Sequence, residues 1–153
     1  MAITIADCVP IFIAHAEGAS ALLHSGWRGT AARIIDRAFA AFSRQGFAAA
    51  DLHVHLGPSI CGNCYEVSAA VATALTGIAA TAPRYVDLRA LIAAHAREAG
   101  VAHIIVSPWC TRCDNARFYS HRAGDAGRQL AVMVARTDAR ADARTGLSRV
   151  DSP

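Results

Sequence analysis

Cys8 and His24 are the two side chains whose types and positions most directly suggest chemistry. Each stands at the end of a short apolar segment, where a β-strand would project it from a rigid scaffold. A thiolate and an imidazole are ligands for Zn²⁺ or copper, and the same pair could serve as a nucleophile and its base. Asp7, next to Cys8, could orient a ligand or stabilise an imidazolium. The spacing also fits a buried cysteine and a hydrogen-bonded core histidine, so the residues alone leave these alternatives open.

The other four cysteines form two Cys-x-x-Cys pairs, Cys61 with Cys64 and Cys110 with Cys113. Two such pairs are typical of a structural zinc site. Here 45 residues separate the pairs, whereas a zinc ribbon usually closes over about 15–20 residues. We therefore expect these cysteines to be thiols in surface loops, reduced in the cytoplasm, and not a zinc site.

His121 and Arg122 lie in a polar, glycine-rich segment that could bind an anion such as phosphate, although a solvated basic loop has the same composition. The chain has seven histidines, fewer than the roughly ten that a multicopper oxidase needs as ligands. The serine-hydrolase elbow, the dinucleotide-binding glycine pattern and the His-Glu-x-x-His motif are absent from the sequence.

The elements that would position these residues follow from apolar spacing. Short Ile- and Val-rich segments predict β-strands over 2–7, 9–14, 20–24, 52–56, 103–107 and 129–135. Helical spacing predicts helices over 31–45, 66–75 and 88–99, with Thr30 as the N-cap of the first and Asp87 as the N-cap of the last. Hairpin-like strand pairs combined with helical crossovers indicate an α+β domain with mixed β-sheets and flanking helices.

The length of 153 residues, with 54 % hydrophobic and 18 % charged residues, predicts one globular domain over 1–136. Residues 137–153 are polar and lack apolar spacing, so we expect a disordered C-terminal tail. The net charge of +3, carried by arginines without any lysine, does not indicate nucleic-acid binding. No apolar stretch approaches the roughly 20 residues that span a bilayer, so we expect a cytoplasmic protein that does not bind membranes.

Four segments together resemble the laccase-domain family, whose members carry the labels multicopper polyphenol oxidase, YfiH-type protein and purine nucleoside phosphorylase. The matching segments are Ala-Asp-Cys-Val-Pro-Ile at 6–11, His-Ser-Gly-Trp-Arg-Gly at 24–29, Gly-Pro-Ser-Ile-Cys-Gly-Asn-Cys-Tyr-Glu-Val at 57–67, and Cys-Thr at 110–111 followed by Phe-Tyr-Ser-His-Arg at 118–122. The resemblance covers about residues 3–135 and implies a YfiH-like fold, of the type also found in a cysteine-hydrolase toxin.

The resemblance further implies a mononuclear site in which one cysteine and two histidines bind Zn²⁺, or Cu²⁺ in some preparations. The matching positions here are Cys8 and His24. The second histidine of the family lies upstream of the Ala-Asp-Cys segment, so we expect the chain to lack an N-terminal part of the family domain. His121 is the nearest candidate in this sequence for a further ligand.

The activity that the resemblance implies is that of a purine nucleoside phosphorylase with adenosine deaminase activity, acting on adenosine, inosine or methylthioadenosine. Arg28 and the loop with His121 and Arg122 would hold the phosphate, and Asp7 would orient His24 or the metal. The expected partners are a purine nucleoside, phosphate and a second copy of the chain in a homodimer. The alternatives are a Cys–His amide hydrolase of the peptidoglycan-precursor editing type, a copper-dependent polyphenol oxidase, and an inactive truncated fragment.

Overall fold

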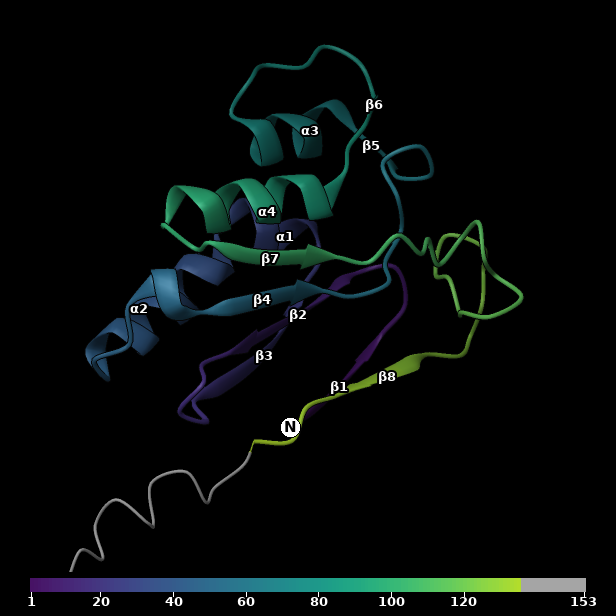
Figure 1. The fold of residues 1–153 in the computed structure, drawn as a ribbon. Coiled ribbons are helices and arrows are strands. Elements are labelled where there is room, and N and C mark those ends of the chain that lie inside the picture. Colours follow the sequence, from purple (N-terminus) through teal and green to yellow (C-terminus); the bar gives the residue numbers. More distant parts are fainter. Residues whose placement is uncertain (136–153) are drawn as a thin grey trace, which may run out of the picture.

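A four-stranded mixed sheet forms the centre of the computed structural model, which describes residues 1–135 (Figure 1). Its strand order is β3 (Ser20–Ser25), β2 (Val9–Ala14), β4 (His53–Leu56) and β7 (His103–Val106). The β3–β2 and β2–β4 pairs are antiparallel, and the β4–β7 pair is parallel. The predicted α+β class with mixed sheets is confirmed. The tail predicted over 137–153 lies outside the described residues.

Helices cover one face of this sheet, and the core lies between the two layers. The helices are α1 (Trp27–Ala31), α2 (Ile34–Arg44), α3 (Ala69–Thr76) and α4 (Leu88–Glu98), with a short 3₁₀ turn at Ala49–Asp51. Alternate residues of β2 are fully buried at Val9, Ile11 and Ile13, because the side chains of a strand point to opposite faces in turn. Ile35 of α2 and Ile92 of α4 pack into the same cluster. None of the helices in residues 1–135 is long and apolar enough to cross a membrane.

The predicted helix over 31–45 is wrong in its N-terminal part. The chain forms two helices there, because Arg33 adopts the left-handed conformation, with φ at 51°, and ends α1. Thr30 is therefore not an N-cap: it lies inside α1, where its hydroxyl donates to the carbonyl of Gly26. Asp87 is the N-cap of α4 as predicted, because its carboxylate accepts from the backbone N–H groups of Arg89 and Ala90.

The helix predicted over 66–75 begins later than expected. Glu66–Val67 forms the short strand β5, which pairs antiparallel with β6 (Arg84–Tyr85). The helix α3 starts after Ser68, whose hydroxyl caps it by accepting from the N–H of Val71. At the other end of the chain, the predicted strand 129–135 is shorter, since β8 covers Gln129–Val132. It pairs antiparallel with β1 (Ala2–Ile5) in a separate two-stranded sheet.

Two loops and one turn meet at the end of the central sheet. The loop after β4 (residues 57–65) and the loop after β7 (residues 107–128) start at the same edge, because β4 and β7 are parallel neighbours. A single parallel bridge between Ser59 and Cys110 continues this pairing into the loops. The turn between β1 and β2 runs through Asp7, a non-glycine residue with a φ of 78°. These three segments carry most of the candidate site.

Candidate functional site

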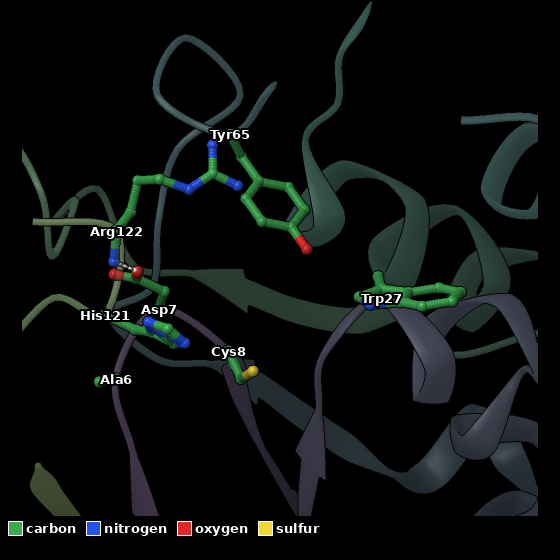
Figure 2. A pocket seen from close by; sticks show the side chains of 7 residues that line it. All are labelled: Ala6, Asp7, Cys8, Trp27, Tyr65, His121 and Arg122. Atoms are coloured by element: carbon green, nitrogen blue, oxygen red, sulfur yellow. Dashed lines mark hydrogen bonds between the residues drawn. The ribbon is translucent and has the colours of Figure 1, made fainter. Parts of the chain in front are cut away.

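A pocket of about 400 Å³ opens where β1 turns into β2 (Figure 2). Its walls come from the β1–β2 turn, the start of α1, the end of the 57–65 loop and the 107–128 loop. The residues that line it are Ala6, Asp7, Cys8, Trp27, Tyr65, His121 and Arg122. The structure thus brings four of the predicted site residues together, from segments more than 100 residues apart in the sequence.

Asp7 holds the 107–128 loop against the β1–β2 turn. Its carboxylate accepts a hydrogen bond from the hydroxyl of Thr111 at 2.6 Å and another from the backbone N–H of Arg122 at 2.7 Å. Asp7 is 7 % exposed and Thr111 is fully buried. Both hydrogen bonds of the carboxylate are made with the 107–128 loop and neither with His24. Asp7 therefore anchors this loop and does not orient His24 in the structure.

Cys8 presents a half-buried free thiol to the pocket. The thiol lies against Gly26: a Cβ at that position would come within 2.8 Å of Sγ, so the absence of a side chain there makes room for the sulfur. Burial first, and the negative charge of Asp7 second, raise the pKa of the Cys8 thiol. The sulfur is therefore a neutral thiol at neutral pH unless a cation such as a metal ion stabilises its thiolate.

His24 lies outside the pocket lining. It is the register partner of Pro10 in the β2–β3 pair, and that pairing ends at Val9 and Ser25, so Cys8 stands in the turn just before the strand. The His24 side chain is exposed. Arg28 also lies outside the lining; it is exposed, and its guanidinium carbon is 4.4 Å from the centre of the Trp27 ring.

Cys8 and His24 have the donor types that Zn²⁺ or copper accepts. Within residues 1–135, however, they do not belong to a group of three or more potential ligands, and His121 does not complete one. The two residues therefore fit a metal site in chemical type, as two of the ligands that it requires.

Two aromatic residues complete the pocket and were not predicted as site residues. Figure 2 shows the Tyr65 hydroxyl pointing into the space between Cys8 and Trp27. Burial raises the pKa of Tyr65, so its hydroxyl keeps its proton at neutral pH. The Arg122 guanidinium donates twice to the carbonyl of Glu66, both at 3.0 Å, and lies 5.1 Å from the Tyr65 ring centre. The sequence did hold a signal for the two aromatic residues, because Trp27 lies in the matching segment 24–29 and Tyr65 in the matching segment 57–67.

The other four cysteines lie in loops as expected, but the structure brings the two pairs together, which the sequence did not predict. The Sγ atoms of Cys61, Cys64, Cys110 and Cys113, the four-cysteine cluster, all lie within 4.8 Å of one another. The cluster could hold a metal ion. The 45-residue separation was misleading because the intervening chain folds away as β5, α3, β6 and α4 and returns as β7, beside β4.

The thiols of the cluster differ in acidity. Burial alone would raise the pKa of Cys110, but the backbone N–H groups of Cys113 and Cys61 donate to its sulfur and lower the pKa to about 7. Hydrogen bonding with Cys64 and with Cys110 raises the pKa of the exposed Cys113 to about 12. The hydrogen bonds around the cluster therefore favour the thiolate form at Cys110 over the thiolate form at Cys113.

Comparison with known proteins gives a family match over almost the whole chain. Residues 1–136 match the family model described as multi-copper polyphenol oxidoreductase laccase. The chain is 38 % identical over 131 residues to adenosine deaminase RL5 from an unknown prokaryotic organism, covering 76 % of this chain and 50 % of the relative. It is 37 % identical over 155 residues to purine nucleoside phosphorylase YlmD from Geobacillus stearothermophilus, covering 90 % of this chain and 57 % of the relative.

Solved structures agree with this match. The crystal structure of YlmD from Geobacillus stearothermophilus superposes with a TM-score of 0.79 at 34 % identity, covering 85 % of this chain and 54 % of that one. The structure of the Bacillus licheniformis protein YfiH superposes with a TM-score of 0.78 at 27 % identity, covering 84 % and 55 %. The chain spans about half the length of the curated relatives that it matches.

Proposed function

The chain belongs to the multi-copper polyphenol oxidoreductase laccase family, and from this premise we propose that its Cys8 pocket binds a purine nucleoside and phosphate for phosphorolysis. Relatives 31–39 % identical to this chain are named purine nucleoside phosphorylases. The name adenosine deaminase RL5 supports hydrolytic removal of the adenine amino group as a second activity of the same pocket. The nucleosides proposed are adenosine, inosine and methylthioadenosine.

The observation that carries the proposal is the composition of the pocket wall. Trp27 and Tyr65 offer two aromatic side chains, against which a flat purine base can stack. His121 and Arg122 stand on the opposite side of Cys8 from Trp27 (Figure 2). Two guanidinium nitrogens of Arg122 already donate to Glu66, and the remaining N–H groups are free to face an anion. A base and a phosphate would then bind side by side in one pocket, with Tyr65 next to Arg122.

Each residue would have a task that its contacts permit. Tyr65 keeps its proton and can donate it in a hydrogen bond to a ring nitrogen or a ribose oxygen. Asp7 anchors the loop through its bonds to Thr111 and Arg122, which fixes where the cationic side chains stand. Arg28 lies over Trp27 and would hold that ring in place.

Cys8 and His24 would be two of the ligands of a Zn²⁺ or Cu²⁺ ion, whose charge would supply Lewis-acid activation of a bound water or phosphate oxygen. The same charge would bring the Cys8 sulfur into its thiolate form. A Cys–His amide hydrolase is less well supported, because the raised pKa of Cys8 keeps its sulfur protonated, whereas the nucleophile of such an enzyme is a thiolate. A cytoplasmic location and a homodimer stay predictions.

The test measures hypoxanthine released from inosine by the 153-residue chain, with zinc or copper supplied, in the presence and absence of phosphate. We expect release to depend on phosphate. Arg122→Gln should raise the KM for phosphate by about 10-fold or more, since it removes a charge-assisted contact. Arg37→Gln removes the same charge from an exposed position on α2 and is the matched control.

Two results would contradict the proposal. The first is the absence of hypoxanthine at any phosphate concentration from a chain that is folded. The second is an equal effect of Arg122→Gln and Arg37→Gln on the KM for phosphate. Ammonia release from adenosine, measured in the same preparations, tests the second activity independently of phosphate.

A further inference from the structure

We infer that the four-cysteine cluster is a structural Zn²⁺ site, separate from the Cys8 pocket, that fastens the 57–65 loop to the 107–128 loop. The cluster was not needed to explain the proposed activity, and its sulfurs do not line the Cys8 pocket. Four cysteine ligands leave a zinc ion without an open position, which is the pattern of a structural site and not of a catalytic one.

The geometry is close to that of a tetrahedral metal site. Zinc–sulfur bonds of about 2.3 Å place the four sulfurs of a tetrahedron about 3.8 Å apart. In the structure the ligand atoms all lie within 4.8 Å of one another, and the Sγ atoms of Cys64 and Cys113 are 3.5 Å apart. The separations of the sulfurs are therefore close to those that a four-thiolate zinc site requires.

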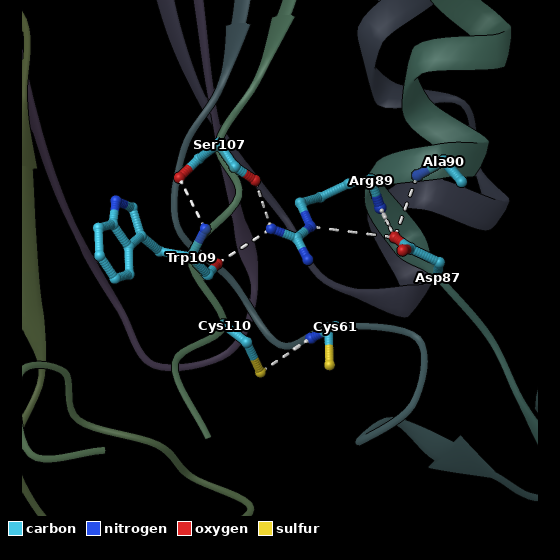
Figure 3. Close-up of polar contacts among 7 residues, drawn as sticks. All are labelled: Cys61, Asp87, Arg89, Ala90, Ser107, Trp109 and Cys110. Carbon is cyan, nitrogen blue, oxygen red and sulfur yellow. Dashed lines mark hydrogen bonds and ion pairs between the residues drawn. The ribbon is translucent and has the colours of Figure 1, made fainter. Parts of the chain in front are cut away.

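The backbone around the cluster is arranged for thiolates. The Cys110 sulfur accepts the N–H of Cys61 at 3.3 Å, drawn in Figure 3, and the N–H of Cys113 at 3.4 Å. Hydrogen bonds from backbone N–H groups to a ligand sulfur stabilise its negative charge and fix its direction. Each Cys-x-x-Cys pair also sits in a hydrogen-bonded turn, closed by Cys64 N–H to Cys61 O and by Asp114 N–H to Cys110 O.

Contacts that involve no sulfur hold the two loops in place. The Arg89 side chain of α4 is 6 % exposed and donates to the carbonyls of Ser107 at 2.6 Å and Trp109 at 3.0 Å (Figure 3). The N–H of Thr111 donates to the carbonyl of Ser59 across the two loops. Ligands on such a fixed framework lose little freedom when a metal binds, which favours binding.

The site would also support the Cys8 pocket from outside. Tyr65 follows Cys64 in the chain, and Thr111, which donates to Asp7, follows Cys110. A metal that joins these two cysteines would hold an aromatic wall of the pocket and its loop anchor at a constant separation. The cysteines would then be positioning residues for the pocket, with no contact to its ligand.

Binding is balanced without any oxidant or reductant. One Zn²⁺ replaces the protons of the thiols, up to four, and these protons pass to solvent. The competing chemistry is a disulfide between Cys64 and Cys113, which would release two protons and two electrons and therefore needs an oxidant. All five cysteines are free in the structure.

The experiment uses the full chain in which Cys8→Ser has removed the candidate thiolate ligand of the pocket, purified with reductant after growth with zinc. We expect elemental analysis to find one zinc per chain. Titration of the zinc-free protein with Co²⁺ should give the intense visible bands of cobalt bound by four thiolates. The exposed ligand is the least disruptive to replace, so Cys113→Ser, added to Cys8→Ser, should weaken cobalt binding by at least about 100-fold.

Three results would overturn the inference. One is a folded Cys8→Ser protein that contains no zinc and shows no tetrathiolate spectrum with Co²⁺. Another is equal cobalt affinity with and without Cys113→Ser. The third combines two findings: protein purified without reductant has an intact mass lower by two hydrogens, as a disulfide requires, and the reduced protein binds no metal. The Co²⁺ titration of the Cys8→Ser chain does not depend on whether the Cys113 variant folds.

Discussion

Replacing Asp7 should separate two contributions to stability at the β1–β2 turn, the hydrogen bonds of the Asp7 carboxylate and the strain of its backbone. The carboxylate holds Thr111 and Arg122 by two short hydrogen bonds, in a place that is 7 % exposed. Hydrogen bonds to a charged group contribute about 1.5–3 kcal/mol each to the free energy of unfolding, and a buried donor left unsatisfied costs a similar amount. The positive φ of 78° adds about 1 kcal/mol of strain for a residue with a Cβ.

These magnitudes predict an order among three variants. Asp7→Ala loses both bonds and keeps the strain, so the free energy of unfolding should fall by about 3–6 kcal/mol. Asp7→Gly loses the bonds but relieves the strain, which should make it about 1 kcal/mol more stable than Asp7→Ala. Asp7→Asn can still accept from Arg122 and donate to Thr111, and should lose only about 1–2 kcal/mol.

Urea unfolding followed by circular dichroism measures the three values on the same chain. Thr111→Val supplies the partner for a double-mutant cycle with Asp7→Gly. We expect the cost of Thr111→Val to be about 1–2 kcal/mol smaller in the Asp7→Gly background, because the bond that it removes is already lost. Additive costs, or an Asp7→Ala variant as stable as Asp7→Asn, would refute the role of Asp7 as the loop anchor.

Two further predictions concern the Cys8 thiol and a partly buried histidine, His95. Gly26→Ala places a Cβ 2.8 Å from the Cys8 sulfur. We expect nucleoside turnover to fall by about 10-fold or more, while the free energy of unfolding falls by only about 1–2 kcal/mol. Unchanged turnover would show that the reaction does not use the Cys8 sulfur. Burial first, and the charge of Arg33 second, lower the pKa of His95, whose Nδ1 is buried without a hydrogen-bond partner. Because the unfolded chain then takes up this proton at higher pH than the folded one, this part of the stability is fully present above about pH 6.5 and is lost as the pH falls. Urea unfolding at about pH 7 and about pH 5 should show a smaller decrease in His95→Gln than in the parent chain, and equal decreases would contradict it.

Local signals in the sequence predicted much of the fold. The β2–β3 pair follows from the composition and the order of two neighbouring strands. The Asp87 cap follows from one side chain just before a helix. The break at Arg33 could not be predicted in this way. The Arg33 guanidinium forms ion pairs with Asp36 of α2 and with Glu98 of α4, so a contact made only in the folded chain accompanies the unusual backbone.

The candidate site was predictable in part, for a related reason. Asp7, Cys8, His121 and Arg122 could be named from the motifs, and the structure gathers them in one pocket. The bond between Asp7 and Thr111 joins residues 104 positions apart, and no local spacing reports it.

The four-cysteine cluster could be recognised only once β4 and β7 were known to be parallel neighbours. Motif spacing finds ligands on one element, whereas the order of strands in the sheet decides which motifs meet.

The proposed function depends on a purine base that stacks against Trp27 and Tyr65. The most direct test is the fluorescence of Trp27 in a Trp109→Phe variant, which leaves Trp27 as the only tryptophan of the chain, titrated with hypoxanthine in the presence of phosphate. We expect a saturable change in the Trp27 emission, with an affinity for hypoxanthine that Tyr65→Ala weakens by about 10-fold or more. An emission that does not respond to hypoxanthine in the folded variant, or a response that Tyr65→Ala leaves unaltered, would contradict it.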